Sequence, residues 1–250
     1  MDYYISEAIW QWVYKNLSDC KCIHTSNERR LRLFVEAIWY ILKTGCQWRM
    51  LPSYYGSWRA IHKRYFRWCQ KGIWNILFSK VKKQPDMEWV MIDSTTIRIH
   101  PCSSGYSKNC QKQEALGRSV GGFTTKIHAL VDALGNPLKI KLTPGQDADI
   151  KQAAELLEGI ETSAVLADKG YDSDELVDNL NEKGCKSIIP PRKNRKQQRE
   201  YDKHIYKERH LVECFFNKIK QFRRVFSRFD KTKISYLSFI NLANILIWLR

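Results

Sequence analysis

Apolar and polar residues alternate at helical spacing through the first third of the chain. Segments 5–17 (ISEAIWQWVYKNL) and 25–45 (TSNERRLRLFVEAIWYILKTG) each gather their apolar residues on one helical face. In the second segment, Ser26 or Asn27 is placed to cap the start of the helix, and Gly45 is placed to end it. This pattern predicts an all-α region at the N-terminus.

Segments 57–72 and 73–83 continue the helical pattern up to Pro85. In the first of them, the apolar side consists of Trp58, Ile61, Tyr65 and Trp68. Its opposite side is basic and consists of Arg59, His62, Lys63, Arg64 and Arg67. Short helices with one basic face are typical of helix-turn-helix-like DNA readers. A plain helical bundle with a solvated basic face explains the same periodicity, so both readings stay open at this point.

From residue 88 the pattern changes to short β-rich segments separated by turns and helices. The predicted strands are 88–100, 124–132, 137–143, 163–168 and 186–190, and the predicted helices are 147–160, 172–184 and one from Tyr206 onward. Residues 133–136 (ALGN) predict a hairpin turn, Asp147 or Asp149 a helix cap, and Asp172 with Glu175 a capping box. The order β-β-β-α-β-α-β-α indicates an α/β domain with a mixed sheet and flanking helices.

The charge reverses sign twice along the chain. The total is +16, and counting by segment gives +10 for residues 1–85, −5 for 86–191 and +10 for 192–249. Basic flanks favour contact with phosphate backbones, because neutralised phosphates release counterions. A generally basic, solvated surface explains the total but not the acidic middle, whereas a metal-dependent nuclease needs acids there. The segment 191–204 is basic and has too few apolar residues for a core.

Eight cysteines are present, and none forms a CxxC unit. A disulfide framework is typical of small secreted chains, and the start of this chain does not resemble a secretory signal. His100, Cys102 and Cys110 come closest to a zinc cluster, but their spacing is unlike that of structural zinc ligands. Reduced thiols are the simpler interpretation. No apolar run reaches the roughly 18 residues that a membrane helix needs, so we expect a cytoplasmic protein.

Two acids lie at positions typical of active sites. Asp93 is inside the apolar strand VMIDST, where a charge is costly unless it is paired or bound to a metal. Asp168 follows the strand SAVLA and opens a Gly-containing turn, where α/β sheets usually place ligands. Each acid alone also fits a structural role, as a strand-end Asp or as a turn cap.

A third acid, Glu213, lies in a strongly basic helix. At 100° per residue from Tyr206, Arg209, Glu213 and Lys220 fall within one 60° arc with Tyr206. The apolar residues of the opposing side are Phe215, Ile219, Phe222 and Phe226. A solvated stripe with an Arg209–Glu213 pair would contribute only a few tenths of a kcal/mol, which gives little reason for the whole constellation.

The spacing Tyr206-x2-Arg209-x3-Glu213-x6-Lys220 resembles the signature of IS4/IS5-type insertion-sequence transposases. The segments IDSTTIR and LADKGYDSDEL resemble the family's two catalytic-acid segments, and residues 45–74 resemble its N-terminal helical domain. The resemblance implies a ribonuclease-H-like core in which Asp93, Asp168 and Glu213 form a DDE triad. Only 44 residues lie between Asp168 and Glu213, which leaves no room for the β-rich insertion of many IS4-type enzymes.

The resemblance therefore implies two domains. Residues 1–85 would be a helix-turn-helix-like DNA-binding domain, and residues 86–250 a ribonuclease-H-like catalytic domain with the basic segment 192–204. The expected cofactor is a pair of Mg²⁺ or Mn²⁺ ions held by the triad, since carboxylates suit hard cations. Arg209 and Lys220 would contact phosphates, Tyr206 would position a strand or stack on a base, and Lys169 would be a further phosphate contact.

The expected reaction is metal-dependent cleavage at the element ends, followed by transfer of the 3′-OH into target DNA. The expected partners are double-stranded DNA, at the terminal inverted repeats and the target, and a second copy of the chain, because joining two ends needs two active sites. No membrane partner is expected, and we expect the protein in the cytoplasm with the nucleoid. Two alternatives remain open, namely a nuclease of the same fold that only hydrolyses DNA and a non-catalytic DNA-binding protein.

Overall fold

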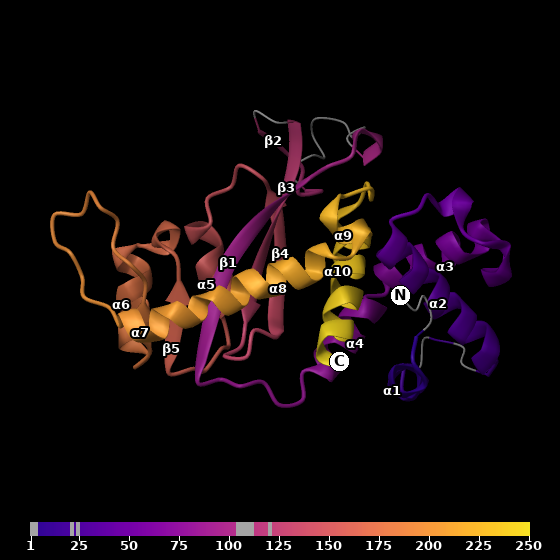
Figure 1. The fold of residues 1–250 in the computed structure, drawn as a ribbon, viewed down its shortest axis with the longest axis horizontal. Coiled ribbons are helices and arrows are strands. Elements are labelled where there is room, and N and C mark those ends of the chain that lie inside the picture. The colour runs from indigo at the N-terminus through magenta and orange to yellow at the C-terminus, as the bar shows by residue number, and fades with distance from the viewer. Residues whose placement is uncertain (1–4, 21–22, 24–25, 104–112, 120–121) are drawn as a thin grey trace. The chain divides into compact units, whose positions relative to one another are not determined.

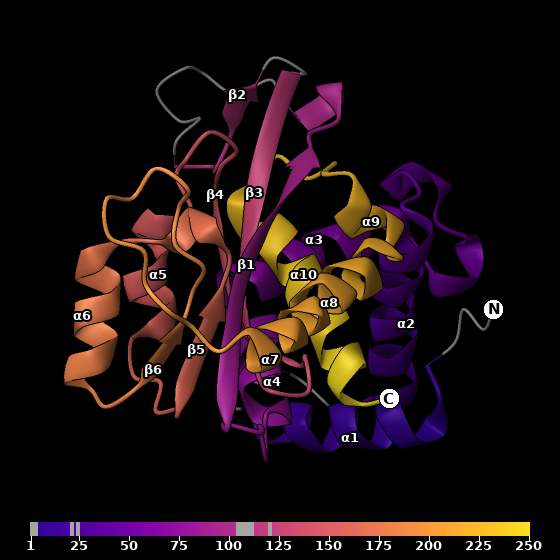
Figure 2. The same ribbon diagram turned by 60° about the vertical axis from the view of Figure 1, so that its left-hand side comes forward.

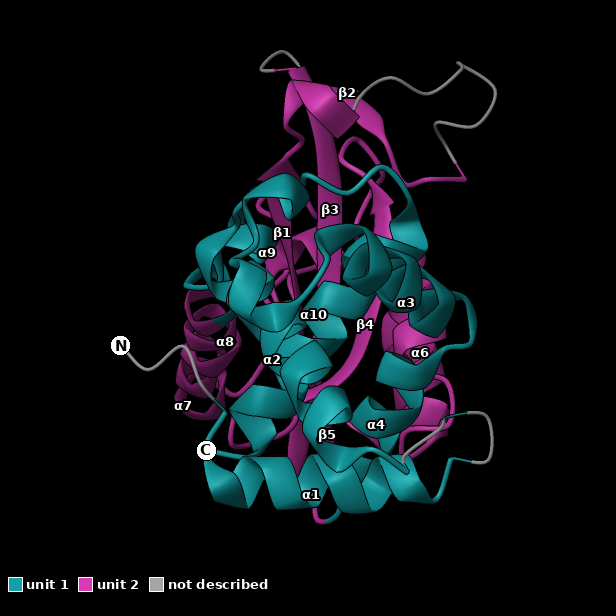
Figure 3. Ribbon diagram, turned by 90° about the vertical axis from the view of Figure 1, so that its right-hand side faces the viewer, with its two compact units in different colours: residues 1–83, 219–250 teal, residues 84–218 magenta. Residues whose placement is uncertain are grey.

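The computed structural model of the chain describes residues 5–20, 23, 26–103, 113–119 and 122–250. The chain divides into two compact units (Figure 3). Unit 1 contains residues 1–83 and 219–250, and unit 2 contains residues 84–218. The first boundary lies within two residues of the expected one. The second boundary was not expected, because the sequence prediction placed residues 219–250 in the same domain as the sheet.

Unit 1 is helical, as the periodicity predicts. Its helices are α1 (Glu7–Ser18), α2 (Glu28–Thr44), α3 (Trp58–Gln70), α4 (Ile73–Val81), α9 (Arg223–Phe226) and α10 (Lys233–Trp248). Both predicted ends of α2 are confirmed. The Asn27 side chain accepts a hydrogen bond of 2.9 Å from the Arg30 backbone N–H, and Gly45 ends the helix at φ 65°, a conformation that favours glycine.

The core of unit 1 forms around α10. Twelve of its sixteen residues are buried, including the polar Asn241 and Asn244, and it packs against α3 and α4. The Tyr65 hydroxyl of α3 donates a hydrogen bond of 2.7 Å to the Ser235 carbonyl at the start of α10. A helix that is apolar on all sides is typical of a buried core element. Within the described residues, no helix is long and apolar enough to cross a membrane.

Unit 2 is built on a mixed sheet (Figure 1). Its strands are β1 (Trp89–Arg98), β2 (Gly117–Ser119), β3 (Gly122–Val131), β4 (Pro137–Pro144), β5 (Ala164–Ala167) and β6 (Lys186–Ile188). The main order is β4-β3-β1-β5-β6, and β2 pairs with the first residues of β3. β3 is antiparallel to β1 and β4, whereas β5 and β6 run parallel to β1. This is the ribonuclease-H-like arrangement expected from the sequence.

Helices cover both faces of this sheet. Figures 1 and 2 show α8 (His210–Lys220), which follows the short helix α7 (Lys203–Tyr206), across one face. The opposite face carries α5 (Ile150–Leu157) and α6 (Asp174–Glu182). Successive residues of a strand point to opposite faces. On β1, Asp93 therefore contacts Arg209 before α8, whereas the next residue, Ser94, contacts Asp149 before α5.

The predicted ALGN turn connects β3 to β4. The Asp132 carboxylate accepts hydrogen bonds from the backbone N–H groups of Leu134 (3.0 Å) and Asn136 (2.7 Å). Gly135 has φ 78°, and a Cβ at this position would come within 3.2 Å of the Leu211 carbonyl oxygen at the start of α8. The glycine thus permits both the turn and the close approach of α8.

Two details of the predicted helices are wrong. The long helix expected from Tyr206 is divided into the end of α7, a 3₁₀ turn (Lys207–Arg209) and α8, and it ends at Lys220, because Phe222 adopts an extended backbone (ψ 110°) before α9. Phe215, Ile219 and Phe222 are buried as predicted, but Phe226 is 62% exposed, since α9 starts a new helical phase. The capping box of α6 does not form. Ser173 is the N-cap and makes no side-chain cap bond, and Asp172 has other partners.

Candidate active site

Strand pairing places Asp93 of β1 beside the end of the neighbouring strand β5, which Asp168 directly follows. β1 and β5 are parallel, and Ile92 is registered with Ala167, so the residue that follows each of them continues the same alignment. Burial is the main cause that raises the pKa of Asp93, and the negative charge of Asp168 raises it further, against the Ser94 N–H and Arg209, which lower it. The two carboxylates therefore interact electrostatically at the carboxyl end of β5.

The turn after β5 fixes the Asp168 side chain. The Gly170 N–H donates a hydrogen bond of 2.8 Å to Asp168 Oδ1, and the Tyr171 N–H donates one of 3.0 Å to the Asp168 carbonyl. A Cβ at position 170 would lie 2.8 Å from Asp168 Oδ1. The sequence Asp-Lys-Gly thus folds the carboxylate back over its own turn and leaves Lys169 exposed beside it.

Arg209 connects the strand acid to the helix acid. Its Nη1 donates to Asp93 Oδ2 at 3.0 Å, and its Nη2 donates to Glu213 Oε1. Burial is the largest single influence and lowers the pKa of Arg209, but the charges of Asp93, Tyr206 and Glu213, with the hydrogen bond to Asp93, together outweigh it, so the net shift is upward. Arg209, in the 3₁₀ turn before α8, and Glu213, in α8, therefore lie on the Asp93 side of this segment, although its apolar face lies well over 90° away on the helical wheel.

Tyr206 lies at the other side of Arg209. The Arg209 guanidinium carbon is 5.9 Å from the centroid of the Tyr206 ring. Burial raises the pKa of the Tyr206 hydroxyl, Arg209 opposes this, and the charge of Asp168 adds to it. The structure thus places Asp93, Tyr206 and Glu213 around Arg209 within unit 2, with Asp168 close enough to influence the pKa of Asp93 and Tyr206. Lys220, the last residue of α8, belongs to unit 1.

A polar cluster on the opposite face of the sheet was missed by the sequence reasoning. Asp149 Oδ1 accepts a hydrogen bond of 2.7 Å from Ser94 Oγ and forms a 3.0 Å ion pair with Lys126 Nζ. His128 Nδ1 is 3.6 Å from the same oxygen, and His128 Nε2 lies 2.8 Å from Thr143 Oγ1. Asp149 does precede α5 as predicted, but its carboxylate makes no cap bond and ties β1 to β3 instead.

Burial lowers the pKa of His128 to about 4, against the opposing charge of Asp149. The imidazole is therefore neutral near pH 7. The available sequence signal was the alternation Lys126, His128 in a strand, which places two polar side chains on the same face as Ser94.

Tyr171 lies between the two groups of acids. Its side chain is buried, and among the described residues its hydroxyl has no hydrogen-bond partner. Burial raises the pKa of this hydroxyl most, followed by the negative charges of Asp149, Asp93 and Asp168. The phenol therefore stays protonated near neutral pH.

The basic segment 192–204 is fastened to the turn that follows Asp168. Asp172, whose side chain is fully buried, pairs with Arg195 Nε at 2.6 Å and with Arg199. Arg192 donates its backbone N–H to Asp172 Oδ2 at 2.8 Å and its guanidinium to the carbonyls of Lys169 and Gly170. Three arginines that suggested a phosphate-binding segment thus have acid or carbonyl partners inside the protein.

The three carboxylates have the donor chemistry for hard divalent cations. In the part of the chain that the structure describes, no three Asp, Glu, His or Cys side chains converge closely enough to hold a metal ion as they stand. Arg209 explains this for the predicted triad, because its guanidinium lies between Asp93 and Glu213. The chemistry of the donor set, three carboxylates, suits such a cation, but in this structure two of them are paired with Arg209. For the zinc alternative, Cys110 lies outside the described residues.

This geometry agrees with what comparisons with known proteins find. Residues 84–234 match the family model "Transposase DDE domain", and residues 5–78 match "Putative transposase of IS4/5 family". The fold and the site define a DDE transposase. The chain belongs to this family, and within it to the IS4/5 type.

One relative in sequence supports this assignment. The chain is similar to a protein of Brucella ovis named "Putative transposase for insertion sequence element IS6501", with 44% identity over 133 residues, which is 51% of this chain and 100% of that protein. Among solved structures, it resembles a piggyBac transposase synaptic complex (15% identity, TM-score 0.36, 75% of this chain and 41% of that one). It also resembles a Mos1 transpososome (13% identity, TM-score 0.29, 88% and 77%).

Proposed function

We propose that this transposase cleaves DNA at the ends of an insertion sequence and transfers the freed 3′-OH into target DNA. The observation that carries the proposal is that Arg209 pairs with Asp93 of β1 and Glu213 of α8, while Asp168, at the end of the adjacent strand β5, is close enough for its charge to raise the pKa of Asp93. Acids from three separate elements gathered in one region are poorly explained by packing alone, because like charges repel.

The acids would hold two divalent ions, Mg²⁺ or Mn²⁺. When bound, such ions polarise the scissile phosphate and activate the attacking oxygen. Asp93 is already oriented for this role, since the Ser94 N–H donates to its Oδ1 at 2.8 Å and leaves Oδ2 to Arg209. Asp168 is oriented by Gly170. Glu213 is the more exposed acid, at 54% of its side-chain surface, and can approach as Arg209 leaves.

Arg209 would then exchange partners. Its guanidinium binds carboxylates in the structure described here, and a phosphate offers the same bidentate geometry. We propose that incoming DNA and cations together displace Arg209 from Asp93 and Glu213 onto a phosphate beside the cut. Tyr206 would stack on a base or position the strand. Lys169 is exposed next to Asp168 and would contact a further phosphate, as would Lys220.

The chemistry consists of two in-line displacements at phosphorus. In the first, a water oxygen forms a bond to phosphorus, the P–O3′ bond breaks, and the products are a 3′-OH and a 5′-phosphate. In the second, that 3′-OH attacks a target phosphate and the target P–O3′ bond breaks. Neither step needs a nucleophile from the protein. Because two ends must be joined, we propose a dimer or larger assembly on DNA.

A cleavage assay tests this function. The substrate is an end-labelled duplex that carries one terminus of the element, incubated with Mg²⁺ and the purified chain. We expect Asp93→Asn, Asp168→Asn and Glu213→Gln each to reduce cleavage at least about 1,000-fold, while DNA binding persists. Full-rate cleavage by any of the three variants would overturn the triad. A target plasmid in the same reaction separates a transposase, which yields joined products, from a nuclease, which yields only cut ends.

A further inference from the structure

A basic groove lies between the start of α2 and the second half of α3 in unit 1. Its volume is about 430 Å³, and its polar lining consists of Ser26, Asn27, Arg30, Arg64, Arg67 and Lys71. Among the described residues, the lining contains four basic side chains and no acid. Like charges gathered without an acid repel one another, so a groove of this kind is stabilised by an anion.

Arg64 is held in place at the wall of this groove. Its guanidinium carbon lies 4.4 Å from the ring centroid of Phe34 and 5.4 Å from that of Trp68. Burial lowers the pKa of Arg64, and the positive charge of Arg67 lowers it further. Stacking on two aromatic rings fixes the guanidinium plane, so little conformational entropy is lost when it binds a ligand.

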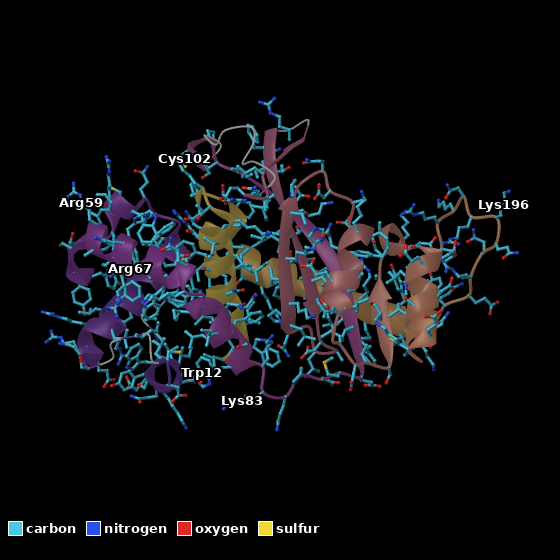
Figure 4. All side chains as sticks on the ribbon, turned by 180° about the vertical axis from the view of Figure 1, so that it is seen from behind. Trp12, Arg59, Arg67, Lys83, Cys102 and Lys196 are labelled. Carbon is cyan, nitrogen blue, oxygen red and sulfur yellow. The ribbon has the colours of Figure 1, made fainter. Side chains whose placement is uncertain are left out.

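The basic segment 192–204 differs from the groove, because its arginines have acidic partners within the protein. Arg195 and Arg199 of the segment 192–204 pair with Asp172 and Asp174. By contrast, Arg30 and Arg67 are exposed, and no carboxylate of the described chain forms an ion pair with either of them. Figure 4 labels Arg67 on α3. The groove, and not the basic segment, therefore offers guanidinium groups to an external anion.

We propose that this groove binds the phosphate backbone of DNA, with Arg30, Arg64 and Arg67 as its contacts. The proposal rests on the proposed function for the choice of DNA as the source of the phosphate. The Ser26 hydroxyl and the Asn27 amide at the start of α2 add neutral hydrogen-bonding groups of the kind that contact phosphate oxygens. The contacts carry no base information, so the groove fixes the register of the helical unit on the duplex and does not read sequence.

A salt-dependence measurement tests the groove without catalysis. The full chain is titrated onto a fluorescent 30-base-pair duplex in EDTA, and the slope of log K against log salt is measured. We expect the variant Arg30→Ala/Arg67→Ala to reduce this slope by between about one and two, since each lost phosphate contact removes about 0.9. Arg67→Lys keeps the charge and should keep the slope. Thermal unfolding of each variant verifies the fold. Arg64 is not replaced, because the rings of Phe34 and Trp68 pack against it.

Arg29 supplies the matched control. It is exposed on α2, next to Arg30, but does not line the groove. We expect Arg29→Ala to leave the slope unchanged. A decrease of less than one in the double variant, or an equal decrease for Arg29→Ala, overturns the groove. This experiment is independent of the catalytic proposal. Cleavage by Asp93→Asn would refute the triad, whereas the binding slope in EDTA does not depend on the triad.

Discussion

Arg209 and Asp93, which are 116 positions apart in the sequence, form a 3.0 Å ion pair between Nη1 and Oδ2. The same guanidinium binds Glu213, one helical turn further along the chain. A single cation thus compensates two of the three acids that the family signature assigns to catalysis. Under the proposed function, Arg209 has to leave these two acids before a metal ion can bind them.

Replacing Arg209 tests this exchange. Arg209→Ala removes the positive charge that competes with a metal ion for the acids. We expect Mn²⁺ to bind about tenfold more tightly, which corresponds to a change of about 1–2 kcal/mol in the charge interaction. Cleavage should nevertheless fall at least about 100-fold, since the phosphate contact is lost. Calorimetric titration with Mn²⁺ measures the first effect and the duplex assay the second. Lys207→Ala, which removes an exposed charge two residues away, is the control, and an unchanged Mn²⁺ affinity in Arg209→Ala would contradict the model.

Asp149 acts through Ser94 on the strand that carries Asp93, so we classify it as a positioning residue. Asp149→Asn removes the carboxylate that pairs with Lys126, and we expect the free energy of unfolding to fall by about 2 kcal/mol. The kcat of cleavage should fall about 10- to 100-fold with little change in KM, because a displaced Asp93 weakens the chemical step and not DNA binding.

Asp147→Asn is the control, because Asp147 contributes its backbone carbonyl, not its carboxylate, to Lys126. A rise in KM with an unchanged kcat would assign Asp149 to the DNA interface instead.

His128 makes stability depend on pH in a defined direction. Its pKa is about 4 in the folded chain, against an ordinary value of 6.5. Between these values the unfolded chain binds a proton and the folded chain does not, so folding loses stability as the pH falls. The loss reaches about 3 kcal/mol below pH 4. Urea unfolding from pH 7 to pH 4 should show this slope, and His128→Gln should flatten it; parallel curves for both proteins would refute the assignment.

Asp172 holds the segment 192–204 against the catalytic turn. Burial tends to raise the pKa of Asp172, but the bonds from Arg195, Arg192 and Arg199 outweigh it, and the net shift is downward. Its contribution to stability is therefore present above its ordinary pKa and is lost as the pH falls through the lowered value.

For Asp172→Asn at pH 8 we expect a loss of about 2–3 kcal/mol and faster trypsin cleavage after residues 192–203. Asp178→Asn, an exposed substitution on α6, should leave the digestion pattern unchanged. Equal digestion rates in the two variants would show that Asp172 does not restrain the segment.

Local patterns were enough to find most elements and most site residues. Alternating β-rich segments and turn residues placed the main strands, and Asn27 with Gly45 marked the ends of α2, because these signals depend on a few adjacent residues. The helix α10 was missed as a separate element, since an element buried on all sides has no polar face to mark its period. The short strand β2 lies inside a predicted loop, and it exists only because β3 provides an edge.

For the site, the sequence by itself pointed to three candidate acids and to the arc that Glu213 shares with Tyr206, Arg209 and Lys220. Only the tertiary structure decided which side chains pair. Arg209 pairs with Asp93 and Glu213, and Asp149 contacts Ser94 and Lys126. Asp172 pairs with arginines of the basic segment. The physical reason is that an acid can cap a helix, bind a cation or hold a turn with similar energy. Long-range strand pairing and burial choose between these, and neither is encoded within a local window.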